Sequence, residues 1–283
     1  MRMATRTGMT MPTRMTITMS TGMTTAMTTT TGTTMSTEAP AAPAEAGAPS
    51  PAGAPSMAGL FRLIQMTDSA FPVGTFSFSN GLETAAHLGI VPDAATLREY
   101  ARSVATQAAF SDGVAALLAF RAARKGDYDA VCAADRDLLL FKMNDEARLM
   151  LCRMGKKFAE LGLRRHGEES LFGRWLADIE AGVTPGTFPV AQGIAFALDG
   201  LDEKALYVSH QYGVINMVLS AALRLVRVSH YDTQQILAEL GGEVEAMYEK
   251  ARNMGFENMN AFVPEMDILA SLHEKGSMRM FMN

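Results

Sequence analysis

The feature that most constrains the fold is a long segment, Tyr128 to Leu163, with apolar residues at the spacing of an α-helix. A repeat of three to four residues gives a helix one apolar face. Here that face comprises Val131, Ala134, Leu138, Phe141, Ala147, Met150, Met154, Phe158 and Leu161. Because the segment is longer than most globular helices, we expect a break near Asn144. Helices of this kind need other helix faces to pack against.

The chain from Met57 onward repeats this pattern. It predicts helices around Leu97–Ala108, from Val114 to a stop near Lys125-Gly126, around Leu171–Ile179, after Pro189, over Glu203–Val226, from Ile236 to Met247 across Gly241-Gly242, and after Pro264. No segment shows the alternation or the Val, Ile and Thr enrichment of strands. We therefore predict an all-α fold, a single compact domain of about eight to ten helices over residues 57–283.

Residues 1–56 have a different composition. Met and Thr dominate residues 1–37, and Pro, Ala and Gly dominate residues 38–56. Such sequences lack the residues that build a core, so we expect a disordered extension. No apolar run in this region is long enough for a secretory signal, and Met57 is a plausible alternative start.

Charge and cysteine usage indicate a cytoplasmic protein that binds neither nucleic acid nor membrane. The formal net charge is -5, whereas nucleic-acid binding favours a basic surface. The only two cysteines, Cys132 and Cys152, are far apart and fit free thiols in a reducing compartment. The longest apolar run, Val214–Val226, is interrupted by Asn216 and Arg224 and is too short to span a bilayer.

No catalytic motif is present. The chain lacks a P-loop, a GxGxxG turn and an HExxH helix, and no GxSxG surrounds Ser69. We interpret Asp68 and Ser69 as a cap or turn that bonds local backbone amides. The chain is therefore predicted not to be an enzyme.

Three residues are candidate metal ligands. Glu83 and His87 are four residues apart on one predicted helix, and His273 precedes a second carboxylate near the C-terminus. Imidazole and carboxylate are acceptable nickel ligands. The alternative is that Glu83 and His87 occupy an ordinary solvated helix face, where such pairs are common.

Two segments are candidate partner contacts. In the first, Leu63–Glu83, the phenylalanines predict a buried or half-buried loop before a helix at Leu82, and loops anchored in this way are often functional. The named contacts in this loop are Phe71, Pro72, Gly74 and Phe76. The second is the C-terminal tail with Arg279, Met280 and Phe281, which suits insertion into a partner's groove. The alternative for Phe281 is that its ring folds back on its own core.

Four ordered blocks resemble the urease accessory protein UreF family. They are DSAFPVGTFSFSNGLE (68–83), FPVAQGIAF (188–196), NMVLSAALRLVRVSHYDTQQIL (216–237) and PEMDILASLHEKGSMRMFMN (264–283). Together they cover the chain from about residue 60 to residue 283, which is more specific than any single motif.

This resemblance implies a non-enzymatic chaperone or adaptor for urease maturation. It would bridge a UreG-like GTPase and a UreD/UreH-like scaffold on apo-urease, form a homodimer and hold no tight cofactor, with nickel in transit past Glu83, His87 and His273. Two alternatives remain open. The chain could regulate GTP hydrolysis by the partner through Arg279, or it could be a stand-alone nickel-binding protein.

Overall fold

The computed structural model describes residues 55–75, 78–260, 263–274 and 280–281, all within the unit Pro49–Asn283. Every regular element in these residues is helical and none is a strand, which confirms the all-α prediction. The predictions for residues 1–54 lie outside the described residues. Of the helices described, ten have ten or more residues, and α2 and α11 are shorter.

In chain order the helices are α1 (Met57–Thr67), α2 (Leu82–His87), α3 (Ala94–Phe110), α4 (Asp112–Lys125), α5 (Tyr128–Leu140), α6 (Asp145–His166), α7 (Leu171–Glu180), α8 (Phe188–Leu198), α9 (Glu203–Leu225), α10 (His230–Gly241), α11 (Val244–Ala251) and α12 (Pro264–Glu274). A short 3₁₀ turn, η2 (Phe256–Asn258), precedes α12.

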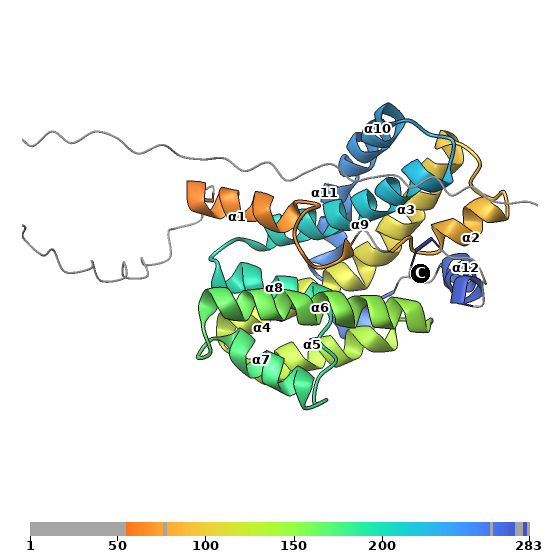
Figure 1. The fold of residues 1–283 in the computed structure, drawn as a ribbon. Helices are drawn as coiled ribbons and strands as arrows, with labels where there is room; N and C mark the ends of the chain where they lie inside the picture. The colour runs from red at the N-terminus through yellow and green to blue at the C-terminus, as the bar shows by residue number, and fades with distance from the viewer. Residues whose placement is uncertain (1–54, 76–77, 261–262, 275–279, 282–283) are drawn as a thin grey trace, which may run out of the picture. The chain divides into compact units, whose positions relative to one another are not determined.

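The helices surround two apolar cores. The first lies among α4, α5, α6, α7 and α8, and the second among α2, α3, α9, α10 and α12 (Figure 1). Helix α9 is the longest helix described and contributes to both cores: Leu206 and Tyr207 belong to the first, and Val218 and Leu219 to the second. The two halves of the domain therefore share one central helix.

Glycines allow α8 to approach its neighbours closely. A Cβ on Gly193 would lie 2.6 Å from the carbonyl oxygen of Ala116 on α4, and one on Gly155 of α6 would lie 2.1 Å from the carbonyl oxygen of Gly186. Real side chains do not tolerate such distances to backbone atoms. These glycines are therefore required by packing.

A buried carboxylate fixes the connection between α7 and α8. Asp135 of α5 accepts hydrogen bonds from the Thr184 hydroxyl (2.7 Å), the Gly186 amide (2.8 Å), and the amide (2.7 Å) and hydroxyl (2.6 Å) of Thr187. Burial raises the pKa of this carboxyl, and the hydrogen bonds from Thr187, Thr184 and Gly186 oppose the increase. No local sequence motif marks this residue.

The predicted helix ends are mostly confirmed. The break near Asn144 separates α5 from α6, and the Asn144 side chain caps α6 by accepting from the Ala147 amide at 2.7 Å. Helix α4 ends at Lys125, and Gly126 follows with φ +71°, the left-handed conformation that terminates many helices.

One predicted helix is wrong. The segment from Ile236 to Met247 is divided at Gly242 into α10 and α11. Glycine is a poor helix former, so two in succession weaken the helix. The two parts also pack in different places, because Leu240 belongs to the second core and Val244 to the first.

Among the described residues, one stretch is long and apolar enough to cross a membrane by length and composition alone. This stretch, Ala94–Lys125, comprises α3 and α4, which meet at Ser111. In its most apolar window, 72% is buried within the domain, so core packing accounts for its composition.

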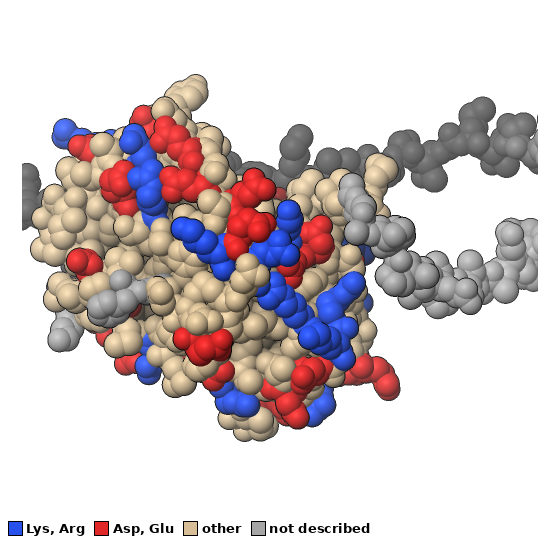
Figure 2. Space-filling model, turned by 180° about the vertical axis from the view of Figure 1, so that it is seen from behind, with Lys and Arg blue, Asp and Glu red and all other residues tan. Residues whose placement is uncertain are grey.

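Some partly exposed charges form pairs between neighbouring helices. Arg98 lies 2.9 Å from Glu239, and Arg121 lies 2.8 Å from Glu203. Basic and acidic side chains are interspersed on the face shown in Figure 2. Exposed pairs of this kind typically contribute less than about 1 kcal/mol each to stability.

Candidate functional site

The loop before α2 is organised by local hydrogen bonds. Asp68 caps the end of α1, and its Oδ1 accepts from the Ala70 amide at 2.7 Å, which confirms the predicted role as a turn residue. Further along, the Tyr100 hydroxyl donates to the Asn80 carbonyl at 2.6 Å. Gly81 follows with φ +77°, and a Cβ there would lie 3.1 Å from the Ala270 backbone nitrogen. The turn thus brings the start of α2 against α12.

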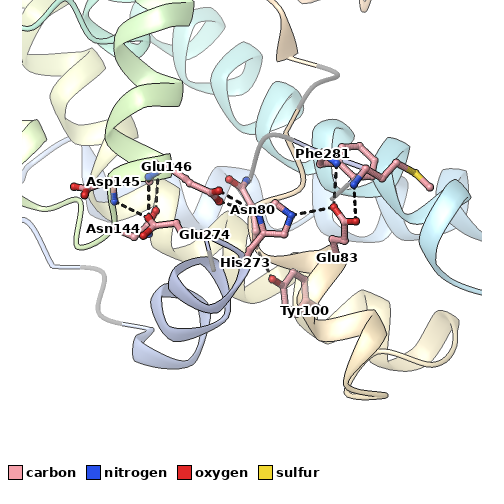
Figure 3. A network of polar contacts seen from close by, with 11 residues as sticks. Asn80, Glu83, Tyr100, Asn144, Asp145, Glu146, His273, Glu274 and Phe281 are labelled. Atoms are coloured by element: carbon pink, nitrogen blue, oxygen red, sulfur yellow. Dashed lines mark hydrogen bonds and ion pairs between the residues drawn. The ribbon is translucent and has the colours of Figure 1, made fainter. Parts of the chain in front are cut away.

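Glu83, in the first turn of α2, is buried and holds the C-terminal tail. Its Oε1 accepts from the Met280 amide at 2.7 Å, and its Oε2 accepts from the Phe281 amide at 3.0 Å (Figure 3). Burial would raise the pKa of this carboxyl, but the two backbone amides and His273 outweigh burial and hold the pKa below its usual value. The carboxylate is therefore favoured at neutral pH.

His273 of α12 lies between two carboxylates. Its Nε2 is 3.0 Å from Oε2 of Glu83, and its Nδ1 is 3.0 Å from Oε2 of Glu146 on α6 (Figure 3). All three residues are buried. The two contacts use both ring nitrogens of one buried imidazole, and they connect α2, α12 and α6.

The end of α12 also caps α6. Oε1 of Glu274 accepts from the amides of Asp145 at 3.0 Å and Glu146 at 3.1 Å (Figure 3). The side-chain amide nitrogen of Asn144 donates to Oδ1 of Asp267 at 3.0 Å. A carboxylate at a helix N-terminus satisfies free amides and interacts favourably with the helix dipole. This contact fixes the position of α12 on the first half of the domain.

The ring of Phe281 completes the second core. It is buried, and the Arg224 guanidinium lies 4.5 Å from the centre of the ring. This distance is within the range of a cation–π interaction. The described part of the tail is thus docked on its own domain through both backbone and side chain.

A cavity of about 170 Å³ lies beside this network, between the loop after α1 and helices α6 and α9. An ion pair between Asp112 and Lys142 lines it. His210 also lines it, and its Nδ1 lies 2.8 Å from the Gln192 side-chain oxygen. Burial lowers the pKa of His210 to about 4, so this ring is neutral at physiological pH.

Comparisons with known proteins identify the family. The UreF family model matches residues 91–241. "Urease accessory protein UreF 2" of Brucella canis is 47% identical over 225 residues, which are 80% of this chain and 92% of that protein. "Urease accessory protein UreF" of Yersinia pestis (strain Pestoides F) is 43% identical over 224 residues, 79% of this chain and 98% of that protein. This chain belongs to the UreF family of urease accessory proteins.

The predicted metal ligands of this UreF-family chain are only partly brought together. Glu83 and His273 are in contact, but His87 ends α2 with an exposed side chain. The two carboxylates approach opposite nitrogens of His273 and do not converge on one point. Among the described residues, no group of three or more His, Cys, Asp or Glu side chains is arranged to hold a metal ion. Nickel contact at these residues stays a prediction.

The predicted partner contacts differ in exposure. Phe71 is half-buried, with its ring 5.3 Å from that of Phe158, whereas Pro72 is exposed. Gly74 has φ +87° and open space where a Cβ would be. Of the other phenylalanines near this loop, Phe78 is buried and Phe61 is exposed on α1. Phe76 lies outside the described residues.

In the tail, Met280 is exposed, so contact between its side chain and a partner stays a prediction. Phe281 takes the alternative position, packed on its own core, and its ring can meet a partner only if the tail leaves this site. Arg279 lies outside the described residues.

Glu274 was noted from the sequence only as the carboxylate beside His273, and Glu146 was missed. Glu146 looks like an ordinary first-turn acid of α6, and its contact with His273 spans 127 residues. No local pattern marks such a pair.

Proposed function

We propose that this UreF-family chain is a non-enzymatic adaptor that supports nickel incorporation into urease. In the cytoplasm it bridges a UreG-like GTPase and a UreD/UreH-like scaffold on apo-urease, as a homodimer with no tightly bound cofactor. Family membership and the names of the relatives support the coarse role, and the docked C-terminal region supports the role as an adaptor.

The observation that carries this proposal is the way α12 and the tail are held. Glu83, His273 and Glu274 fix the inner side of this region to α2 and α6. On the outer side, Ile268 and Leu272 are exposed at a spacing of four residues. A rigidly held helix that presents an apolar stripe loses little entropy when it docks, which favours binding.

The tail carries another exposed apolar side chain. Met280 is exposed directly before the anchored Phe281. A flexible thioether adapts to an irregular partner surface, and the fixed Phe281 backbone limits how far Met280 can move. We assign Ile268, Leu272 and Met280 to the contact with the scaffold.

Nickel enters this proposal as cargo. Both oxygens of the Glu83 carboxylate accept tail amides, and His273 uses both ring nitrogens. A nickel ion would reach these two side chains only when the tail amides leave Glu83. Nickel contact at this place therefore requires tail release.

A co-purification experiment tests the proposal. The full chain is expressed with the UreD-like and UreG-like proteins of the same host, beside an Ile268→Asp/Leu272→Asp variant and a chain truncated before Lys275. We expect the full chain to co-elute with the scaffold and both changed chains to lose it.

The matched control is Tyr231→Asp, which places a charge at an exposed aromatic residue of α10. The control should bind the scaffold as the unchanged chain does. Retention of the scaffold by the double variant would refute the assigned surface. Failure of the unchanged chain to bind either partner would refute the adaptor role.

A further inference from the structure

Helix α6 carries a concentration of positive charge that the rest of the chain does not share. Between Arg148 and Arg165 it has one acidic residue, Glu160, and six basic residues: Arg148, Arg153, Lys156, Lys157, Arg164 and Arg165. The whole chain has 25 basic and 30 acidic residues, so its overall charge is negative. A local excess of positive charge in an acidic protein calls for a physical explanation.

Most of these charges lie on the solvent side of α6, which crosses the front of the domain (Figure 1). This side, which we call the outer α6 face, consists of Leu149, Arg153, Lys156, Lys157, Glu160 and Arg164, all exposed or partly exposed. At 3.6 residues per turn, these six positions fall within about 100° of the helix circumference. The other two cations have contacts elsewhere: Arg148 donates to the Lys142 carbonyl at 2.8 Å, and Arg165 donates to Asp199 at 2.7 Å.

The helix dipole explains only part of this charge. Cations stabilise the last turn of a helix, which accounts for Arg164 and Arg165. Arg153, Lys156 and Lys157 are more than two turns from either end of α6, beyond the reach of that effect. Arg153 and Lys157 are also four residues apart, a spacing at which like charges weaken a helix. The middle of α6 therefore carries charge that its own stability does not require.

Carboxylates next to the outer α6 face do not tie up its cations strongly. Lys157 lies 2.7 Å from Glu160, and Lys156 lies 3.3 Å from Glu180 of α7. All four side chains are more than a third exposed, so these pairs contribute little to stability. Arg164 has no ion pair with another residue that the structure describes. Carboxylates of a partner can thus replace Glu160 and Glu180 at little cost.

The buried side of α6 holds this row of charges in a fixed position. A Cβ on Gly155 would lie 2.1 Å from the Gly186 carbonyl oxygen, and one on Gly162 would lie 2.5 Å from the Phe172 ring. The first turn of α6 is capped by Glu274. Such close packing prevents α6 from tilting or rotating. A fixed row of charges loses little entropy when it binds, which favours docking.

We infer that the outer α6 face docks an acidic protein surface, and that the UreG-like GTPase carries this surface. The inference rests on the proposed function and names the contact for its second partner, because the scaffold is assigned to Ile268 and Leu272 on α12. Opposite charges on two proteins speed their encounter and select the partner. Leu149, 46% exposed, adds an apolar contact at one end of the row.

A nucleic acid fits the same face less well. The row is one helix wide and contains four cations, and Glu160 lies among them. Proteins that bind nucleic acids present broader basic surfaces, and each of their phosphate contacts uses a cation. With a formal net charge of -5, the chain as a whole repels a polyanion.

A binding titration tests this inference. The labelled UreG-like protein of the same host is titrated with the complex of the full chain and its scaffold, and fluorescence anisotropy is measured at low and high salt. The variant is Arg153→Glu/Lys157→Glu, changed at two exposed positions, so helix content and unfolding midpoint should stay the same. We expect its dissociation constant to rise at least about 10-fold, with a weaker dependence on salt.

The matched control is Arg136→Glu/Lys250→Glu, which reverses the same number of charges at exposed positions of α5 and α11. The control should bind the GTPase as the unchanged chain does. Equal binding by both variants would overturn the inference and leave the adaptor role intact, and so would loss of the scaffold instead of the GTPase. If the unchanged chain bound no GTPase, both the inference and the proposed function would fail.

Anionic lipid vesicles provide a further arm of the experiment. A row of cations can also attract a negatively charged membrane surface. If the unchanged chain bound these vesicles and the Arg153→Glu/Lys157→Glu variant did not, a membrane would occupy the outer α6 face and the inference would be overturned. Absence of vesicle binding, together with loss of the GTPase by the variant, would support it.

Discussion

Glu83 and His273 are 190 residues apart in the chain, yet their side chains meet at 3.0 Å in the interior of the domain. The same Glu83 carboxylate accepts the amides of Met280 and Phe281. One acidic residue in the short helix α2 therefore contacts both α12 and the described part of the tail. The candidate surface for the scaffold depends on this buried contact.

Replacing Glu83 with Gln should release the tail and destabilise the domain. An amide cannot accept from two backbone amides and His273 together, so buried donors are left unpaired. We expect a loss of about 2–4 kcal/mol in the free energy of unfolding. Urea denaturation measures this loss, and limited proteolysis should show faster cleavage after α12.

Glu160→Gln is the control for Glu83→Gln. Glu160 pairs with Lys157 at 2.7 Å on the surface of α6, and such pairs contribute less than about 1 kcal/mol. If the Glu83 variant were as stable and as resistant to protease as this control, Glu83 would not hold the tail.

Stability should decline with acidification because of His210. The pKa of this buried ring is lowered from 6.5 to about 4, so between these values the unfolded chain binds a proton that the folded chain does not. Stability is therefore lost as the pH falls through this window, by up to about 3 kcal/mol. Urea denaturation at pH 7, 6, 5 and 4 measures the slope.

The variant His210→Gln should remove most of that slope, because it removes the titrating ring while keeping a polar side chain beside Gln192. A His230→Gln variant, changed at an exposed histidine of α10, should keep the slope of the unchanged chain. Equal slopes in all three proteins would assign the acid sensitivity to other groups.

Gly155→Ala should disrupt the packing of α6 on the start of α8. The new methyl would lie 2.1 Å from the Gly186 carbonyl oxygen, and backbone atoms cannot move aside as a flexible side chain can. We expect a loss of about 3 kcal/mol or more, measured by thermal and urea unfolding.

The matched substitution Gly213→Ala should have the opposite effect. Gly213 lies inside α9 with open space where a Cβ would be, so alanine should stabilise the helix by up to about 1 kcal/mol. Similar losses in both variants would mean that close packing is not the reason for Gly155.

Asp135→Asn should loosen the connection between α7 and α8. The carboxylate accepts four hydrogen bonds, two of them from backbone amides, whereas an asparagine NH₂ group would face these donors. The expected loss is about 2–4 kcal/mol. Asp129→Asn, on the exposed side of the same helix, should change stability by less than about 1 kcal/mol. Hydrogen exchange of the Gly186 and Thr187 amides should increase only in the first variant.

The sequence predicts most of this fold because helix signals are local. Asn144 and Gly126 mark helix ends through their own side-chain or backbone properties, and both predictions are confirmed. The prediction failed at Gly242, where apolar periodicity continues although Leu240 and Val244 pack in different cores. Periodicity shows that a residue is buried, but it does not show which core buries it.

The contacts of the candidate site are harder to predict from local sequence signals. Glu83 and His273 were identified as chemically active types, but the expected neighbour of Glu83 was His87, four residues away. The actual partners of Glu83 come from α12 and the tail, His273 also contacts Glu146 of α6, and tertiary packing alone brings these groups together. Glu83 and His87 belong to the same short helix, but Glu83 is buried and His87 is exposed. His87 therefore does not take part in the buried network.

The position of Phe281 in the second core also has a consequence for biosynthesis. Leu82 and Ala85 belong to the same core as Leu269 and Phe281, which leave the ribosome much later. While Leu269 and Phe281 are still inside the exit tunnel, this core cannot close, although the helices of the first core can already assemble. Each new molecule therefore exposes the apolar side of α2 until these later residues emerge.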